Sequence, residues 1–149
     1  MELPQALRDN YLFRGLSDPH IDEILAMTSV KSFMGGDTLV RQFGKDSDLL
    51  IVLRGTAQIK TFSGDTIAEV GAGSVLGEVS LIDDESRSAT VTSKGDTEVA
   101  VIPSEKLKEM MKHDLGMRCV MMENLAKLIC QRLRTANIQL DGMMAGATR

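Results

Sequence analysis

Between residues 30 and 102 the chain repeats one pattern, in which short runs of β-branched and aliphatic residues are separated by turn residues. The separators are rich in Gly, Asp, Lys and Ser, and the runs recur at regular intervals. Short strands at such spacing are typical of an antiparallel sandwich or barrel, so the region predicts a mainly β fold. The predicted strands cover residues 38–40, 49–53, 57–62, 66–70, 89–92 and 99–102.

A helical pattern precedes the β region. Ser17, followed by Pro19, is a helix start, because serine caps the first turn and proline fits within it. Apolar residues at helical spacing then predict a helix over about residues 17–28. The length of 149 residues fits a single domain.

The helical period returns after Pro103. It predicts helices over about residues 104–140, with a break near Gly116. Residues 142–149 have the composition of a flexible tail, so the predicted domain covers residues 1–141.

The last predicted helix is apolar on more than one face. A helix of this kind packs on its own domain and on a second partner, which predicts a homodimer through residues 117–140. A single broad core face is the alternative interpretation. The apolar residues are Val120, Met121, Leu125, Leu128, Ile129 and Leu133.

Charge and hydropathy exclude several partners. The net charge of −4 and the pI near 5.2 give no general attraction to nucleic acid or to an anionic membrane. The longest apolar run, residues 49–53, is far shorter than the about 20 residues that span a bilayer. The N-terminus lacks the apolar stretch of a secretory signal, so we expect a cytoplasmic protein.

The cysteines and histidines predict neither a disulfide nor a metal centre. Cys119 and Cys130 are separated by roughly 16 Å along a helix, too far to bridge, and we interpret them as ordinary small hydrophobes in a reducing compartment. His20 and His113 are expected to be exposed, without partners nearby in sequence. Because no histidine lies between residues 30 and 102, a metal-dependent enzyme on a jelly-roll barrel is disfavoured, and we predict a protein that is not an enzyme.

The segment from residue 71 to residue 89 carries the chemistry. A short helix that opens after Gly77 would present free N–H groups to an anion. The planar fork of Arg87 suits a phosphate, and Ser88 and the amide of Ala89 add donors beside it. The Glu78 carboxylate can accept a hydrogen bond from a sugar hydroxyl. Together these residues predict a site for a phosphate and a ribose.

This segment resembles the phosphate-binding cassette of the cyclic-nucleotide-binding domain family. The matching runs are Gly77-Glu78-Val79-Ser80-Leu81-Ile82 and Arg87-Ser88-Ala89-Thr90, with further similarity in residues 12–17 and 49–55. The resemblance covers roughly residues 12–140. It implies an antiparallel double-stranded β-helix, a jelly-roll-like β-roll of about eight strands, with an N-terminal helix and C-terminal hinge and lid helices.

The resemblance also implies roles for individual residues. Arg87 would hold the cyclic phosphate, Glu78 would bind the ribose 2′-hydroxyl, and Gly77 would supply a backbone contact, with Val79 and Ala89 beside them. Ser88 stands where a threonine is associated with a preference for cGMP, so cAMP is the expected ligand and cGMP the other option.

Some positions depart from the family pattern. Ser86 replaces the usual proline before the arginine, and the acidic partner of that arginine is left open between Asp46 and Asp48. The carboxylates of residues 83–85 approach the phosphate site, and we expect them to point outward.

Three residues of the last predicted helix are candidate lid contacts by position only: Arg132, Ala136 and Asn137. Arg132 would pair with Glu78, and Asn137 would meet the purine edge.

The predicted function is therefore a regulatory module that senses a cyclic nucleotide without a metal or a cofactor. Binding would move the C-terminal helices about a hinge at residues 112–116 and signal to an effector protein. The alternative is a degenerate domain that has lost its ligand and serves in dimerisation or protein interaction. Whether the module acts alone or as part of a larger chain is left open.

Overall fold

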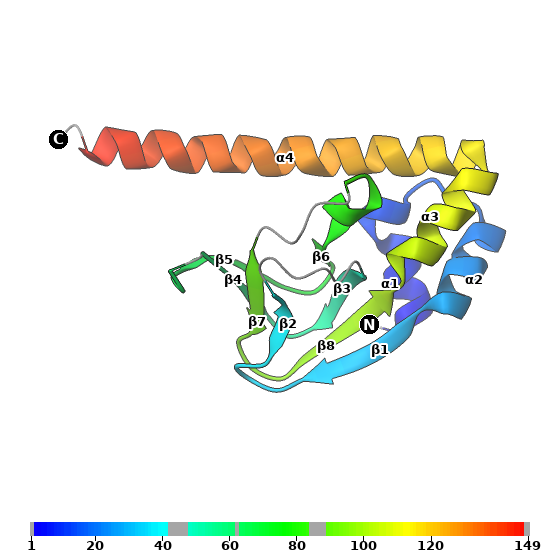
Figure 1. The fold of residues 1–149 in the computed structure, drawn as a ribbon, viewed down its shortest axis with the longest axis horizontal. Helices are drawn as coiled ribbons and strands as arrows, with labels where there is room; N and C mark the ends of the chain where they lie inside the picture. The colour runs from blue at the N-terminus through cyan, green and yellow to red at the C-terminus, as the bar shows by residue number, and fades with distance from the viewer. Residues whose placement is uncertain (1, 42–47, 62, 84–88, 148–149) are drawn as a thin grey trace.

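The computed structural model describes residues 2–41, 48–61, 63–83 and 89–147. Two four-stranded antiparallel sheets face each other, most of the helices gather at one end of them, and the last helix runs along one side of the molecule (Figure 1). The strands are β1 (Ser29–Phe33), β2 (Thr38–Val40), β3 (Leu49–Arg54), β4 (Ala57–Lys60), β5 (Thr66–Val70), β6 (Val75–Leu76), β7 (Thr90–Ser93) and β8 (Thr97–Ile102).

The sheet order confirms the predicted β-roll. One sheet has the order β1-β8-β3-β6 and the other β2-β7-β4-β5, and every paired strand is antiparallel. The sequence pattern did not predict β1 as a separate strand, because its residues are mostly exposed and polar or charged residues interrupt them. It also did not predict β6, because a strand of two residues has no detectable period.

Strand β3 is apolar from Leu49 to Leu53 because both of its faces are buried there. Alternate side chains of a strand point to opposite faces. Leu49, Ile51 and Leu53 pack in the core between the sheet and the helices. Leu50 and Val52 pack in a second core between the two sheets. The β-roll and its helices are therefore joined through one central strand.

The N-terminal region contains α1 (Leu3–Asp9), the 3-10 helix η1 (Tyr11–Phe13) and α2 (Asp18–Met27). The predicted helix over residues 17–28 is present, and the Ser17 hydroxyl caps it by accepting a hydrogen bond from the His20 N–H at 3.4 Å. Helix α1 was not predicted.

The C-terminal region contains α3 (Ser104–His113) and α4 (Leu115–Ala147). The break lies at Asp114, two residues before Gly116. The expected flexible tail is wrong for residues 142–147, which continue α4, while residues 148–149 lie outside the described part.

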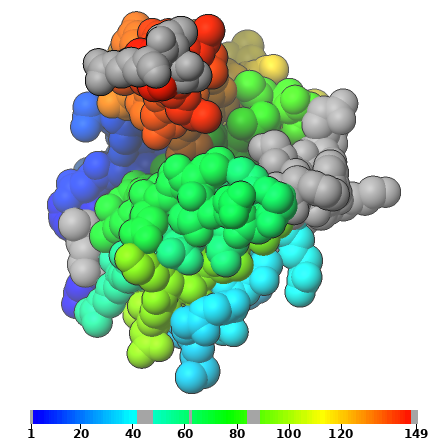
Figure 2. All heavy atoms as spheres, turned by 90° about the vertical axis from the view of Figure 1, so that its left-hand side faces the viewer, coloured from blue at the N-terminus to red at the C-terminus, as the bar shows by residue number. Residues whose placement is uncertain are grey.

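Only the first part of α4 packs on the domain. Met117, Met121 and Leu125 are buried, whereas every residue from Gln131 to Gly146 is exposed. Figure 2, which looks along α4 from its C-terminal end, shows this exposed part lying over β4 and β5.

Cys119 and Cys130, interpreted as ordinary small hydrophobes, are both exposed free thiols. The core-facing positions near Cys119 are taken by Met117 and Met121, and those near Cys130 by the partly buried Leu128 and Ile129. Across the described residues, no helix is both long and apolar enough to cross a membrane.

Candidate functional site

The candidate site is built on a tight turn between β6 and the 3-10 helix η2 (Glu78–Leu81). Gly77 has φ 79° and ψ 16°, a left-handed conformation that a residue without a Cβ adopts readily. Its carbonyl accepts a hydrogen bond from the Ser80 N–H at 3.2 Å, and the Ile82 N–H closes the helix on the Val79 carbonyl at 3.0 Å. The helical turn predicted over residues 77–82 is therefore confirmed.

Glu78 is the buried charge of this turn. Its side chain is 6% exposed and forms an ion pair with Arg132 of α4, whose side chain is 43% exposed. The second terminal nitrogen of Arg132 donates to the carbonyl of Val75 in β6. Partial burial lowers the pKa of Arg132, but a guanidinium keeps its charge at neutral pH. The expected pairing of Arg132 with Glu78 is present, and it ties α4 to the cassette.

The structure describes only some of the other candidate residues. Val79 is 45% exposed on η2, and Ala89 is half-buried just before β7. Ala136 and Asn137 are exposed on α4, about one turn beyond Arg132, and their roles stay predictions. The candidates Arg87 and Ser88 lie outside the described residues, as do Ser86, Asp46 and two of the three loop carboxylates, Asp84 and Glu85.

The cassette helix shares a core with the helices that follow the β-roll. Leu81 of η2 belongs to the same buried cluster as Met111 of α3 and Met121 of α4. A displacement of η2 would therefore shift both C-terminal helices, because the side chains that they share with η2 are close-packed.

Two contacts of this region were not predicted. The side-chain amide of Asn124 in α4 donates to the carbonyls of Leu12 and Arg14, each at 2.8 Å. His20, expected to be exposed and without partners nearby in sequence, is half-buried and contacts Asp114, 94 residues away, at 2.7 Å. Neither contact has a signal in the sequence, because the partners are about a hundred residues apart and depend on the folded arrangement.

His113 also has a partner, Glu109, at 2.8 Å and four residues away on α3. This contact could have been found, because residues at that spacing are neighbours on a helix surface. In the described part of the chain, no three His, Cys, Asp or Glu side chains gather in a way that could hold a metal ion.

Comparison with known proteins adds an independent observation. The family model described as "Cyclic nucleotide-binding domain" matches residues 30–114, which contain α3 and all of the β-roll except Ser29, the first residue of β1. The chain belongs to the cyclic-nucleotide-binding domain family. The resemblance inferred from the cassette residues is thereby confirmed.

Three known proteins are similar to this chain in sequence or in structure. The cyclic AMP receptor protein of Thermus thermophilus is 28% identical over 139 residues, 91% of this chain, and the structure of the catabolite activator protein from that organism aligns with a TM-score of 0.72. A solved structure from Geobacter metallireducens, described as a cyclic nucleotide-binding protein, has a TM-score of 0.78 and 26% identity and covers 89% of this chain and 99% of its own. The cAMP-dependent protein kinase regulatory subunit of Debaryomyces hansenii is 29% identical over 99 residues, 66% of this chain.

The domain spans 62% of the Thermus receptor protein and 22% of the Debaryomyces subunit. It thus matches less than two thirds of the length of these curated relatives.

Proposed function

We propose that this domain is a regulatory module that binds a cyclic nucleotide, with cAMP preferred over cGMP, and signals through its C-terminal helices to a partner protein. The observation that carries the proposal is the buried Glu78 on a glycine turn, bridged to α4 by Arg132. Burying a carboxylate costs free energy unless it is paired, so the buried Glu78 indicates a functional role for this carboxylate.

The use that fits is recognition of a ribose. A ribose hydroxyl would donate to Glu78, and Arg87 would meet the phosphate with parallel hydrogen bonds. Because Arg132 already occupies an oxygen of Glu78, the nucleotide would have to share or displace it. Binding would thereby change the contact that holds α4 at the cassette, which gives the two states that a switch requires.

We infer that the module is not an enzyme and works without a metal or a cofactor. Its chemistry consists of hydrogen bonds and charge, with no acid–base pair placed for hydrolysis among the predicted site residues. Cys119 and Cys130 as free thiols fit a reducing compartment, so we place the protein in the cytoplasm.

A titration tests the proposal. Calorimetry with cAMP and cGMP should show saturable binding that is tighter for cAMP, and Arg87→Glu should abolish it by reversing the charge at the phosphate. Arg54→Glu is the matched control, because Arg54 is exposed at the end of β3 and should leave binding unchanged. No binding of either nucleotide by the folded wild-type protein would favour the degenerate, ligand-free module.

The proposed partner in assembly is a second copy of the chain, through α4. Its apolar residues include an unbroken series at alternating spacings of three and four residues, the repeat of a two-stranded coiled coil. Met122 and Ile129 of this series pack partly against the core, whereas Leu133 is 59% and Leu140 54% exposed. The series, which we call the α4 seam, comprises Leu115, Cys119, Met122, Ala126, Ile129, Leu133, Ala136, Leu140 and Met143.

Oxidative cross-linking tests this dimer and its orientation. In a parallel pair, the two Cys119 side chains of the α4 seam would face each other across the axis, whereas Cys130 lies beside the seam. The wild-type protein and Cys130→Ser should form a cross-linked dimer, and Cys119→Ser should not. Leu133→Glu should yield monomers in sedimentation equilibrium. A wild-type protein that sediments as a monomer at tens of micromolar would refute the dimer.

A further inference from the structure

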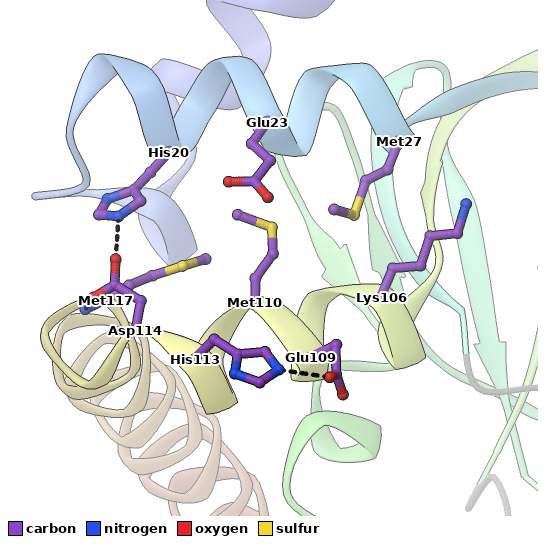
Figure 3. Close-up of a pocket in the computed structure, with 9 residues that line it drawn as sticks. All are labelled: His20, Glu23, Met27, Lys106, Glu109, Met110, His113, Asp114 and Met117. Atoms are coloured by element: carbon purple, nitrogen blue, oxygen red, sulfur yellow. Dashed lines mark hydrogen bonds and ion pairs between the residues drawn. The ribbon is translucent and has the colours of Figure 1, made fainter.

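The joint between α3 and α4 consists of one residue, Asp114. Its backbone is extended, with φ −136° and ψ 93°, between two helical segments. The direction in which α4 leaves the domain is therefore determined close to this residue. Its side chain lines a cavity of about 400 Å³ between α2, α3 and the start of α4 (Figure 3).

Both carboxylate oxygens of Asp114 have partners. Oδ1 accepts a hydrogen bond from the Met117 N–H at 3.0 Å and so caps the first turn of α4. Oδ2 lies 2.7 Å from Nε2 of His20, which comes from α2 and reaches across the cavity (Figure 3). These contacts lower the pKa of Asp114, the Met117 amide most and the His20 hydrogen bond next. One carboxylate thus joins the start of α4 to α2.

His20 is itself held in place. Its Nδ1 lies 3.0 Å from the Ser17 hydroxyl, the residue that caps α2. The side chain of His20 is 26% exposed, and that of Asp114 is 45% exposed. A continuous series of hydrogen bonds therefore runs from the N-terminus of α2 to the N-terminus of α4.

We propose that His20 and Asp114 are positioning residues that hold the α3–α4 joint against α2 and thereby set the direction in which α4 carries Arg132 to Glu78. The first part concerns the fold alone, and the effect on the nucleotide rests on the proposed function. Arg132 lies eighteen residues beyond the joint on one continuous helix, so a small rotation at Asp114 displaces its guanidinium from the cassette.

The carboxylate of Asp114 also brings a charge to this contact. The other charged groups lining the cavity are Glu23 of α2 and Lys106, Glu109 and His113 of α3. His113 pairs with Glu109 of its own helix, so it cannot join α3 to α2.

A distance measurement tests the joint without any nucleotide. Two spin labels, at Ile67→Cys in β5 and Gln139→Cys in α4, report the direction of α4 through the distance between them. The native cysteines are first removed by Cys119→Ser and Cys130→Ser. The labelled protein is diluted with unlabelled protein so that only distances within one chain are measured. His20→Ala should broaden the distance distribution, while His20→Gln, which keeps a donor, should leave it narrow. His113→Ala is the matched control and should also leave it narrow.

Asp114→Asn adds a second, independent variant. Asparagine still caps α4 but lacks the negative charge. Its distribution should be broader than that of the wild type and narrower than that of His20→Ala, because the contact with His20 loses its charge but not its hydrogen bond. Equal distributions for the wild type, His20→Ala and Asp114→Asn would overturn the proposal.

The dissociation rate of bound cAMP then links the joint to the site. It should rise about fivefold in His20→Ala and stay unchanged in His113→Ala. A broadened distribution with an unchanged dissociation rate would overturn the link to the nucleotide. If the wild-type protein binds no cAMP while His20→Ala still broadens the distribution, the proposed function fails and the role of the joint stands.

Discussion

Removing Arg132 should destabilise the domain, even though the side chain is nearly half exposed. Arg132→Ala leaves the carboxylate of Glu78, 6% exposed, without its cation. Breaking a fully buried pair from one side costs about 3–5 kcal/mol, whereas a fully exposed pair contributes about 0–1 kcal/mol. Because Arg132 is 43% exposed, water can replace part of its contribution, and we expect a loss of about 2 kcal/mol.

Urea unfolding at pH 7 without nucleotide measures this loss. With a slope of about 2 kcal/mol per molar urea, the midpoint should fall by about 1 M. Arg134→Ala is the matched control, because Arg134 is an exposed arginine two positions further along α4 and should change stability by less than about 0.5 kcal/mol. Adding Glu78→Gln to Arg132→Ala should restore part of the loss, since the buried group is then neutral.

The reasoning would be refuted if Arg132→Ala and Arg134→Ala had the same midpoint. In that case Glu78 finds water or another donor at no cost, and the ion pair does not hold α4 to the cassette. A loss that Glu78→Gln does not reduce would attribute the effect to packing of the arginine stem instead of to its charge.

Further predictions concern the turns and the joint. Gly55 and Gly64 share a left-handed backbone, with φ 88° and 89°, but a Cβ on Gly55 would lie 2.4 Å from the Asp96 carbonyl oxygen, while one on Gly64 would meet nothing within 4 Å. Gly55→Ala should therefore lower the free energy of unfolding by at least about 1 kcal/mol more than Gly64→Ala, and equal losses in urea unfolding would contradict this. Because the folded state lowers the pKa of Asp114, its carboxylate stabilises the fold above the unfolded value near 4 and loses this effect as the pH falls through the folded pKa. The stability of the wild type relative to Asp114→Ala should thus shrink on acidification below about pH 4, and a difference that does not depend on pH would show that the capping charge is irrelevant.

The β-roll could be predicted because each of its main strands has a local signal. Residues 49–53 form an apolar run bounded by turns, and the run reflects a strand that is buried on both faces. Strand β1 could not be separated from its surroundings, because its face is exposed and its residues mix polar with apolar types. Helix α1 has only seven residues and two buried side chains, Ala6 and Leu7, so its period is too short to recognise.

The candidate site could be predicted only in part. Gly77 and Glu78 are adjacent in the sequence, and the turn they form is local. The partner of Glu78 lies 54 residues away, and only the position of Arg132 on the last predicted helix suggested it. The contact between His20 and Asp114 spans 94 residues and has no local or family signal, because it depends on how α2 docks on the joint. The rotation of α4 about its own axis decides which of its residues face the core, and it leaves Cys119 exposed. This rotation likewise depends on packing in the folded protein, so the sequence alone did not predict it.

The length of α4 has a mechanical consequence. A helix of 33 residues is about 50 Å long, and Arg132 lies about 25 Å from its start. A rotation of about 10° around the start would move Arg132 by about 4 Å, enough to break a hydrogen bond, and would move the far end by about 9 Å. The exposed end would therefore move about twice as far as Arg132 does, so an effector that contacts the last turns would detect a larger displacement than the one at the cassette.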